Sequence, residues 1–452
     1  MTEIVPEVKR PILKTKLPGP RAQEIVARDS KCMSPAFTRP YPAVLSKGEG
    51  VWLTDVDGNV LLDFNAGIAV TATGHCHPDV VAAIQKQAAQ LIHMSGTDFY
   101  YEVEVQLAEK LCGCVPTGAD NRAFLCNSGT EAIEGSLKLA RYKTGRQGII
   151  GFIGAFHGRS MGSLSVTASK TTQRRGFFPL VPGVFHAPYA NCYRCVYNQE
   201  PSKCALDCVG YIENHIFQTL IDPEEVAAIV VEPIQGEGGY IVPPARFLQR
   251  LRDLTAKYGI MLVVDEVQSG MGRTGKMFAI EHSGVKPDIV AIGKGIASGV
   301  PLGAFVAGSH IMTWPPGAHG TTFGGNPIAC AAALTTIGLL EGGLMANAAD
   351  VGGFIIDRLR QMQQRYEMIG DVRGIGLMIG VEIVKDRATK TPGRKERDAI
   401  VQKCFENGLL ILGAGQSSLR LCPPLIISKG EAAVGLDILD QVMEQVQREA
   451  TG

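Results

Sequence analysis

Short, fully apolar runs alternate along the middle of the chain with longer segments whose apolar residues recur every three or four positions. The runs AAIVVEP (227–233), IMLVVDE (260–266) and DIVAIG (288–293) have the length and composition of buried parallel strands. Between the first two lies FLQRLRDLTAKYG (247–259), whose spacing predicts an amphipathic helix that ends at Gly259. A helix that joins two buried strands is typical of a crossover unit, so the pattern predicts an α/β fold with a largely parallel sheet.

The two ends of the chain follow a different pattern from the middle. GVWLTDVDGNVLLDF (50–64) alternates apolar and polar residues around Asp57-Gly58, which predicts a hairpin with a tight turn. NPIACAAALTTIGLL (326–340) predicts a helix that leads out of the parallel sheet. We therefore expect three segments: 1–75 contributing to a small domain, 76–325 forming the large domain, and 326–452 completing the small domain.

Composition and charge limit the classes of partner. The chain has 452 residues, 45% hydrophobic and 19% charged, as in an ordinary globular protein. Lys and Arg total 44, as do Asp and Glu, so no overall field attracts a polyanion such as nucleic acid. No apolar run approaches the ~20 residues needed to span a bilayer, and the mixed charges of the first residues differ from a secretory signal. We expect a cytoplasmic protein with a small-molecule partner, and neither nucleic acid nor membrane as a partner.

Four of the twelve cysteines cluster in a polar segment. Their spacing, C-x2-C-x8-C-x3-C, is close to that of a four-thiolate zinc site, although the second pair is one residue wider than C-x2-C. A structural metal, disulfides and free thiols all remain open, and none of these interpretations makes the cluster catalytic. The four residues are Cys192, Cys195, Cys204 and Cys208.

An acid and a lysine follow two of the predicted strands. Asp265 ends the run 260–266, and Lys294 comes directly after the run 288–293. The carboxyl ends of parallel strands meet at one edge, where open α/β sheets bind their ligands. An acid can keep a pyridine nitrogen protonated, and a lysine amine can bond covalently to an aldehyde carbon. The pair therefore indicates pyridoxal phosphate as the cofactor.

Two nucleotide-binding motifs compete for the loop after Asp265. GMGRTG (270–275) matches G-x-G-x-x-G, but no acidic-ended strand follows about 20 residues later, as a dinucleotide site requires. GMGRTGKM (270–277) matches most of a P-loop, yet Met277 stands where a hydroxyl must bind magnesium. Chance matches of this kind are expected in a chain with 53 glycines.

Two other segments suit the phosphate and the ring of the cofactor. CNSGTEAIEGSLKLAR (126–141) places Ser128, Gly129 and Thr130 at the start of a helix, whose free N–H groups and positive dipole end can hold a phosphate. A simple helix cap is the alternative. GIIGFIGAFHGRS (148–160) places Phe156 at the end of a strand, where its ring can stack on a pyridine, although a core phenylalanine is the alternative.

The residues after Asp265 also suit a planar ligand. Asp265 and Val267 are two positions apart on a strand, so their side chains face the same side. An acid and a β-branched side chain can then contact one ring, and Gln268 can reach its phenolic oxygen.

Together these segments resemble the class III pyridoxal-phosphate aminotransferases, the group of 4-aminobutyrate, ornithine and acetylornithine enzymes. The resemblance runs from about residue 20 to 445. The fold it implies is the PLP-dependent transferase fold type I, with a mostly parallel seven-stranded sheet and a smaller domain built from both chain ends. It also implies a homodimer or a dimer of dimers, with active sites at the subunit interface. The matching motifs are LVVDEVQSGMGRTG, EPIQGEGG, AFHGRS, the Lys294 region, TTFGGNP and LRLCPPLI.

The resemblance assigns cofactor roles residue by residue. A free lysine has a pKa of about 10.4, so Lys294 must be held neutral before it can act as a base. The implied roles at the ring are the covalent link for Lys294, the partner of the ring nitrogen for Asp265, stacking for Phe156, contact with the ring face for Val267, and a contact to the phenolic oxygen for Gln268. The implied phosphate-binding residues are Ser128, Gly129 and Thr130, joined by Thr322 of the neighbouring subunit.

The resemblance also implies four substrate-binding residues. Arg420 resembles the arginine that binds an α-carboxylate through paired hydrogen bonds, and Arg159 the one that reaches a distal carboxylate. An ω-amino acid has no carboxylate near its reacting carbon, so Arg420 needs a substitute anion. We expect Glu232 to pair with Arg420 in the resting enzyme. Ile68 resembles the residue that lines the pocket in bacterial 4-aminobutyrate and acetylornithine enzymes.

The function implied is transamination of an ω-amino acid. We expect 4-aminobutyrate as the amino donor and 2-oxoglutarate as the 2-oxo acid, giving succinate semialdehyde and glutamate. Ornithine, acetylornithine and broad-specificity aminotransferases are alternatives. A racemase is another, because KTKLPGP and TRPYP near the N-terminus resemble that branch. A binding protein that retains this shape is a further alternative, but both Asp265 and Lys294 are present.

Overall fold

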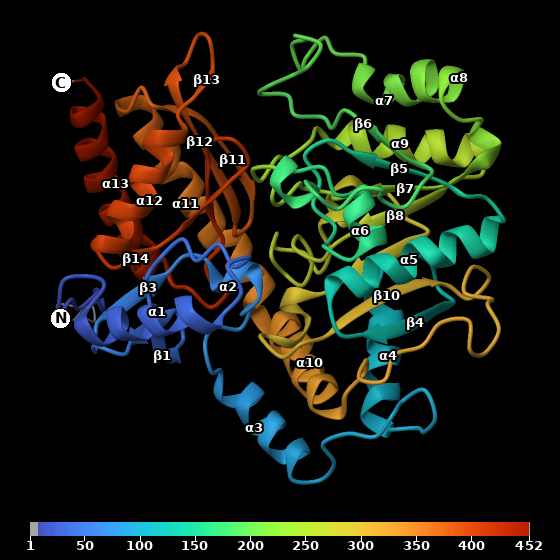
Figure 1. The fold of residues 1–452 in the computed structure, drawn as a ribbon, viewed down its shortest axis with the longest axis horizontal. Helices are drawn as coiled ribbons and strands as arrows, with labels where there is room; N and C mark the ends of the chain where they lie inside the picture. Colours follow the sequence, from blue (N-terminus) through green and yellow to red (C-terminus); the bar gives the residue numbers. More distant parts are fainter. Residues whose placement is uncertain (1–7, 452) are drawn as a thin grey trace, which may run out of the picture.

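A seven-stranded sheet forms the core of the larger half of the molecule in the computed structural model, which describes residues 8–451 (Figure 1). The strands from β9 to β6 are all parallel, whereas β10 runs antiparallel to both of its neighbours. The predicted, mostly parallel seven-stranded sheet is therefore confirmed. In spatial order the strands are β4 (Asn121–Cys126), β10 (Gly303–Gly308), β9 (Ile289–Ile292), β8 (Met261–Asp265), β7 (Val226–Val231), β5 (Gly148–Phe152) and β6 (Val184–Ala187).

Helices cover both faces of this sheet. Alternate residues of β8 point to opposite faces: Leu262 packs into the same core cluster as Phe247 of α9 (Ala245–Tyr258), while Val263 packs into the cluster that holds Leu137 of α5 (Gly129–Thr144). The central strands are buried on both sides, which explains why they are continuously apolar in sequence. As predicted, α9 joins β7 to β8 and is capped by Gly259, whose φ of 63° is left-handed.

Two smaller sheets lie outside the seven-stranded sheet, and the first of them combines strands from both chain ends. One is ordered β1 (Leu45–Glu49), β2 (Trp52–Asp55), β3 (Val60–Asp63) and β14 (Leu409–Leu410). The other is ordered β11 (Ile369–Ile375), β12 (Met378–Asp386), β16 (Ser418–Leu421) and β15 (Leu412–Ala414), with β13 (Thr391–Pro392) paired to β12. Parallel pairing of β14 with β3 confirms a unit built from both ends. The boundaries at residues 75 and 325 stay predictions.

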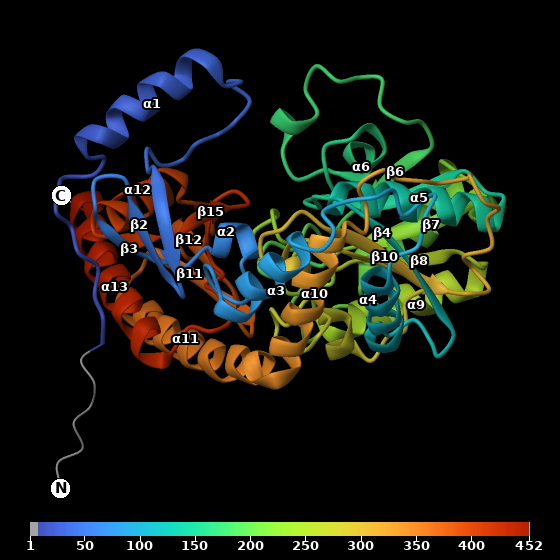
Figure 2. The same ribbon diagram turned by 90° about the horizontal axis from the view of Figure 1, so that it is seen from below.

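The N-terminal hairpin forms as the sequence predicts. β2 and β3 pair antiparallel, and Gly58 in the turn between them has a φ of 84°, which favours glycine. Helices from both ends surround the smaller sheets (Figure 2). They are α1 (Pro20–Cys32), α11 (Met345–Arg365), α12 (Arg394–Glu406) and α13 (Lys429–Thr451).

One helical stretch, Pro327–Arg365, is long and apolar enough to cross a membrane by length and composition alone. Its first part, α10 (Pro327–Leu339), packs against α3 (Pro78–Ala88) and α4 (Glu102–Cys114), and Ala329 and Ile337 are buried there. A core helix of a globular protein passes the same test, so this stretch is weak evidence for a membrane span. The predicted cytoplasmic location stays a prediction.

One predicted element boundary is wrong. β5 ends at Phe152, so Phe156 lies in the turn after the strand rather than at its end. The chain leaves the sheet early because Gly154 adopts a φ of 89° and turns the backbone. The remaining helices are short: α2 (Ala66–Ala69), α6 (Met161–Val166), α7 (Asp207–Tyr211) and α8 (Phe217–Thr219).

Candidate active site

The predicted acid and lysine meet at the carboxyl edge of the seven-stranded sheet. β8 and β9 are parallel neighbours, with Asp265 opposite Ala291, and Lys294 begins the turn after β9 with a φ of 44°. Burial lowers the pKa of the Lys294 amine, although the carboxylates of Asp265 and Glu232 act in the opposite direction. The structure thus supplies the low-dielectric environment that a lysine base requires.

Asp265 is held in place by a buried histidine. Its Oδ2 lies 2.7 Å from His157 Nδ1, and its Oδ1 accepts a hydrogen bond from the Val267 backbone N–H at 2.9 Å. Burial opposes a charge on His157, but the hydrogen bond and the negative charge of Asp265 outweigh it and raise the pKa of the imidazole. We name Asp265, His157, Glu232 and Lys294 the floor of the site. His157 was missed in the sequence, although it stands inside the motif AFHGRS.

The N-terminus of α5 lies against this floor. A Cβ on Gly129 would sit 2.5 Å from Val267 Cγ1, and a Cβ on Gly293 would sit 3.2 Å from Gly129 Cα. Both glycines are therefore needed for the helix to approach the strand ends. Ser128 caps the helix by accepting the Glu131 N–H at 3.4 Å, so the alternative of a cap is confirmed.

Phe156 and Gln268 line the other side of the site. The Phe156 N–H donates to Glu232 Oε2 at 3.1 Å, which fixes the turn after β5. Gln268 packs over Gly236, where a Cβ would lie 2.3 Å from its Nε2. Among the described residues, the buried Oε1 of Gln268 and Nε2 of His157 have no hydrogen-bond partner. Such unpaired buried atoms leave hydrogen-bonding capacity that a polar ligand could use.

These residues fit pyridoxal 5'-phosphate. The start of α5 offers backbone N–H groups without intrahelical acceptors, as an anion requires. Asp265 could supply the negative charge for a ring nitrogen, and the unpaired amide oxygen of Gln268 leaves an acceptor for a polar substituent of a ligand. The residues that would hold the group are Ser128, Gly129, Thr130, Phe156, Asp265, Val267, Gln268 and Lys294; each assignment stays a prediction.

The predicted pairing of Glu232 with Arg420 is wrong. Glu232 Oε1 instead accepts the Gly236 N–H at 3.0 Å, while its Oε2 accepts the Phe156 N–H. Burial, together with the nearby charge of Asp265, raises the pKa of Glu232 to about 7, although His157 lowers it. A carboxyl group that is partly neutral at pH 7 is a poor counter-ion for a guanidinium. Its assignment to the substrate is untested.

Glu237, five residues further along, is the partner of Arg420. Its Oε2 lies 3.1 Å from Arg420 Nη1, and its Oε1 accepts a hydrogen bond from Lys170 Nζ. Burial alone would raise the pKa of Glu237, but Arg420 and Lys170 outweigh it and lower the pKa. We name Lys170, Glu237 and Arg420 the rim of the site. The motif EPIQGEGG contains both glutamates, and sequence reasoning selected the wrong one.

Ile68 occupies an unusual backbone turn beside the rim. Ala66, Gly67, Ile68 and Ala69 all have positive φ, from 49° to 68°, a conformation that costs energy for residues with a side chain. The turn is secured by Asp63, whose carboxylate accepts the Ala66 N–H. Ala69 packs with Tyr240 and Cys422, which places Ile68 next to the segments that carry Glu237 and Arg420.

Two predicted residues lie on the surface of the single chain. Arg159 is exposed, and its guanidinium carbon lies 5.7 Å from the centre of the Phe156 ring. Thr322 is also exposed, on a segment that packs against residues 92–97. The exposure of Thr322 is what a residue serving a neighbouring subunit requires, but that role stays a prediction.

The rival motif GMGRTG is a packing loop. A Cβ on Gly275 would lie 2.9 Å from Ala349 Cβ, and one on Gly272 would lie 2.9 Å from Leu340 Cδ2. The glycines therefore serve contact with the helices that follow residue 327. Residues 270–278 form turns and no α-helix begins in that stretch, so the positive helix end that a dinucleotide site uses is missing there.

Comparison with known proteins adds independent evidence on the family of this chain. The family model for class-III aminotransferases matches residues 33–443. The chain is 39% identical over 442 residues to the alanine/serine racemase of Pyrococcus horikoshii, covering 96% of this chain and 93% of that enzyme. It is 38% identical over 435 residues to the 4-aminobutyrate aminotransferase of Mycobacterium leprae, covering 95% and 97%. A solved amine transaminase from an uncultivated Pseudomonas species, in its PLP-bound form, shares 31% identity and a TM-score of 0.84, covering 92% and 98%.

Proposed function

Because the chain belongs to the class-III aminotransferase family, whose members depend on pyridoxal 5'-phosphate, we propose that it transfers the amino group of an ω-amino acid to a 2-oxo acid. The pair we propose is 4-aminobutyrate and 2-oxoglutarate, with succinate semialdehyde and glutamate as products. The observation that carries this proposal is the ion pair between Arg420 and Glu237 at the rim.

The rim pair compensates the charge of Arg420 when the bound substrate has no carboxylate near its reacting carbon. Glutamate has a carboxylate on its reacting carbon, and Arg420 can bind it through two parallel hydrogen bonds. An ω-amino acid brings no carboxylate to that place, and a buried guanidinium left without an anion is costly. Glu237 supplies that anion in the resting state. When glutamate or 2-oxoglutarate binds, Glu237 is displaced from Arg420 and keeps Lys170 as its partner.

The distal carboxylate is common to both substrates. We propose that Arg159 binds it, since its guanidinium lies over the Phe156 ring at the exposed side of the site. Both substrates then share one anchor at Arg159 and differ only at Arg420. Ile68, in the left-handed turn, would line the apolar chain between the two arginines.

The floor residues provide the proton transfers. When bound, pyridoxal 5'-phosphate supplies an electron-withdrawing ring that stabilises negative charge on the reacting carbon. Lys294 Nζ, whose pKa is lowered by burial, would take the proton from that carbon and deliver it to the bound cofactor rather than back to the substrate. Asp265, oriented by His157 and the Val267 N–H, keeps a negative charge where the ring nitrogen must remain protonated.

We further propose that the enzyme is a homodimer in which Thr322 joins the partner's phosphate site. Apolar side chains are exposed on the two segments that pack together around Thr322: Ile92 is 63% exposed and Phe323 61%. His93 and Phe323 hold these segments together with ring centres 5.1 Å apart. Exposed apolar residues gathered at one place favour burial against a second chain.

A racemase is the second candidate, favoured by the 39% identity to the alanine/serine racemase. Racemisation uses the same floor but returns the proton to the opposite face of the carbon. It also involves a single substrate with an α-carboxylate, so the alternation of Arg420 between Glu237 and a substrate would serve no purpose.

A panel of amino donors separates the candidates. The purified holoenzyme is given 4-aminobutyrate, ornithine, acetylornithine, lysine, leucine, alanine or serine, with 2-oxoglutarate or pyruvate as acceptor. Amino products and the chirality of the remaining donor are both measured. We expect glutamate to form fastest from 4-aminobutyrate and 2-oxoglutarate. Inversion of a chiral amino acid without formation of glutamate would instead establish a racemase.

A further inference from the structure

A long connection without helix or strand carries the four clustered cysteines. Residues 188–206 link β6 to α7, and Cys208 lies in the first turn of α7. Connections longer than ~15 residues without secondary structure are uncommon in compact folds and usually have a function. We name this connection, with Cys208, the cysteine loop.

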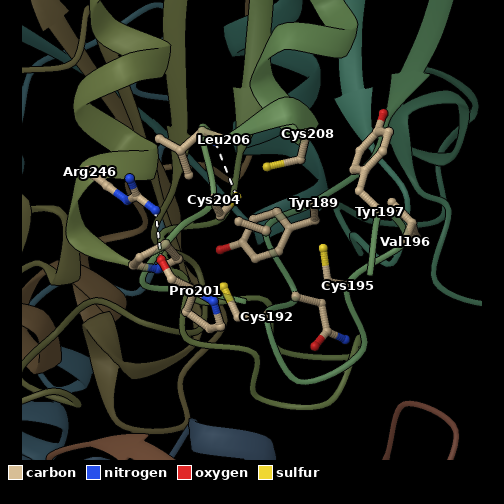
Figure 3. Close-up of a pocket in the computed structure, with 13 residues that line it drawn as sticks. Tyr189, Cys192, Cys195, Val196, Tyr197, Pro201, Cys204, Leu206, Cys208 and Arg246 are labelled. Atoms are coloured by element: carbon tan, nitrogen blue, oxygen red, sulfur yellow. Dashed lines mark hydrogen bonds between the residues drawn. The ribbon is translucent and has the colours of Figure 1, made fainter. Parts of the chain in front are cut away.

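The four thiols line one small cavity (Figure 3). The cavity has a volume of about 20 Å³, room for a single particle of the size of a water molecule. Cys192 and Cys195 line it from one turn, and Cys204 and Cys208 line it from the start of α7. All four are free cysteines, and only Cys208 is fully buried.

We propose that Cys192, Cys195, Cys204 and Cys208 bind one structural Zn²⁺ ion. Four thiolates from two pairs of closely spaced cysteines are a common ligand set of structural zinc. Soft thiolate ligands favour zinc over calcium or magnesium, which prefer oxygen. The four thiols release four protons when the ion binds, and neither sulfur nor metal changes oxidation state.

The surroundings of the cavity suit the resulting charge. A zinc ion with four thiolates carries a net charge of −2. Arg246, at the start of α9, lines the same cavity and donates from Nη2 to the Pro201 carbonyl oxygen at 2.8 Å. This hydrogen bond orients the exposed guanidinium beside the site.

The sulfurs must move closer together to share an ion. Among residues 8–451, no three His, Cys, Asp or Glu side chains already lie close enough to hold a metal. Three of the four cysteines stand on the cysteine loop outside any helix or strand, so no regular element has to be broken for them to approach one another. Closure of the site by the ion also compensates the entropy of ordering a long connection.

The site would fix a contact between the seven-stranded and the five-stranded sheets. Between the first two cysteines, Arg194 forms an ion pair with Glu382 of β12 at 3.0 Å, and the Tyr193 carbonyl oxygen accepts from Lys390 Nζ at 2.8 Å. Tyr189 also lines the cavity, and its hydroxyl donates to the Glu232 carbonyl oxygen at 2.9 Å. The zinc ion thereby braces the segment that carries Glu232 and Glu237.

Metal analysis of the purified holoenzyme tests the proposal. The enzyme is expressed with added zinc, passed through metal-free buffer and measured by inductively coupled plasma mass spectrometry. We expect about one zinc per chain. The double variant Cys192→Ser/Cys204→Ser should lose at least about nine-tenths of it. The matched control Cys32→Ser/Cys76→Ser, which changes two exposed cysteines outside the loop, should keep it.

Two measurements on the unaltered enzyme decide the matter if the double variant does not fold. Exchange of zinc for cobalt(II) should produce the strong visible bands of a tetrahedral thiolate site. Removal of zinc with a mercurial, followed by reduction with excess thiol, should lower the midpoint of thermal unfolding by at least about 5 °C. A metal-free enzyme with four alkylatable thiols in the loop would overturn the proposal, as would a mass reduced by two or four hydrogens, which marks disulfides. Iron with inorganic sulfide would equally overturn zinc.

Discussion

The floor and the rim of the site contain two glutamates from one motif, five residues apart, in opposite electrostatic settings. Burial and the nearby charge of Asp265 raise the pKa of Glu232 to about 7, although His157 and two backbone N–H groups lower it. Glu237 lies between Arg420 and Lys170, which lower its pKa despite its burial. The difference comes from residues far away in sequence. The position of a glutamate within the motif therefore does not determine whether it is charged. The side chains that other segments place beside it determine this.

The floor and the rim also differ in how easily their interactions can be exchanged. In the floor, Asp265, His157 and Glu232 are held by buried hydrogen bonds that leave little freedom. In the rim, the Glu237 side chain is 18% exposed and the Lys170 side chain 37%. Water can reach the rim and assist the exchange of one anion for another. The floor thus serves chemistry and the rim serves the choice of substrate.

The largest effect is expected in the floor, from Lys294→Ala. Without the amine, no side chain remains to carry the proton at the reacting carbon, and turnover should fall by roughly 10³-fold or more. Steady-state assays with 4-aminobutyrate and 2-oxoglutarate measure the loss. Circular dichroism and thermal unfolding should show an intact fold. Retention of more than a tenth of the activity would remove Lys294 from the chemistry.

A smaller effect is expected from His157→Asn, which keeps a hydrogen-bond donor near Asp265 but removes the titrating charge. Hydrogen bonds to charged groups exceed neutral ones by about 1 kcal/mol, so turnover should fall roughly 5-fold. The imidazolium is present below the raised pKa of His157 and is lost as pH rises through it. The wild-type rate should decline across that step, and the variant should lack the decline. An unchanged pH profile would argue for a purely structural histidine.

The smallest effect is expected from Glu232→Gln, in stability rather than turnover. The folded protein holds the Glu232 proton up to a pKa of about 7, whereas the unfolded chain releases it near 4.5. Wild-type stability should therefore fall as pH rises between these values, with a slope of at most about 1.4 kcal/mol per pH unit. The variant lacks this contribution, so its deficit relative to wild type should shrink from pH 5 to pH 8. Denaturant unfolding at several pH values measures it, and a constant deficit would contradict the raised pKa.

Much of the fold was predictable from the hydrophobic pattern. Strands buried on both faces, such as β7 and β8, are continuous apolar runs, and the helix between them has a regular amphipathic spacing with a glycine cap. The turn at Phe156 was mispredicted because the apolar sequence continues beyond the strand while Gly154 bends the backbone away.

Site residues could be predicted only where the local sequence pattern also determines where the residue lies in the fold. Asp265, Val267 and Gln268 follow one strand, and their proximity to Lys294 follows from neighbouring parallel strands. Arg420 and Glu237 are separated by 183 positions, and no local pattern reveals such a pair. The left-handed turn at Ile68 also escaped prediction, because three of its four residues carry side chains that normally avoid positive φ.

The pairing at the rim is tested most directly by single half-reactions of two matched variants, Glu237→Gln and Glu232→Gln. The cofactor's absorbance change is followed after mixing the enzyme with either 4-aminobutyrate or glutamate alone. For Glu237→Gln, we expect the rate with 4-aminobutyrate to fall at least about 10-fold more than the rate with glutamate, because Arg420 is left without an anion only in the first case. Glu232→Gln should leave the ratio of the two rates close to that of the wild type. Equal losses in Glu237→Gln, or selective loss in Glu232→Gln, would contradict the account.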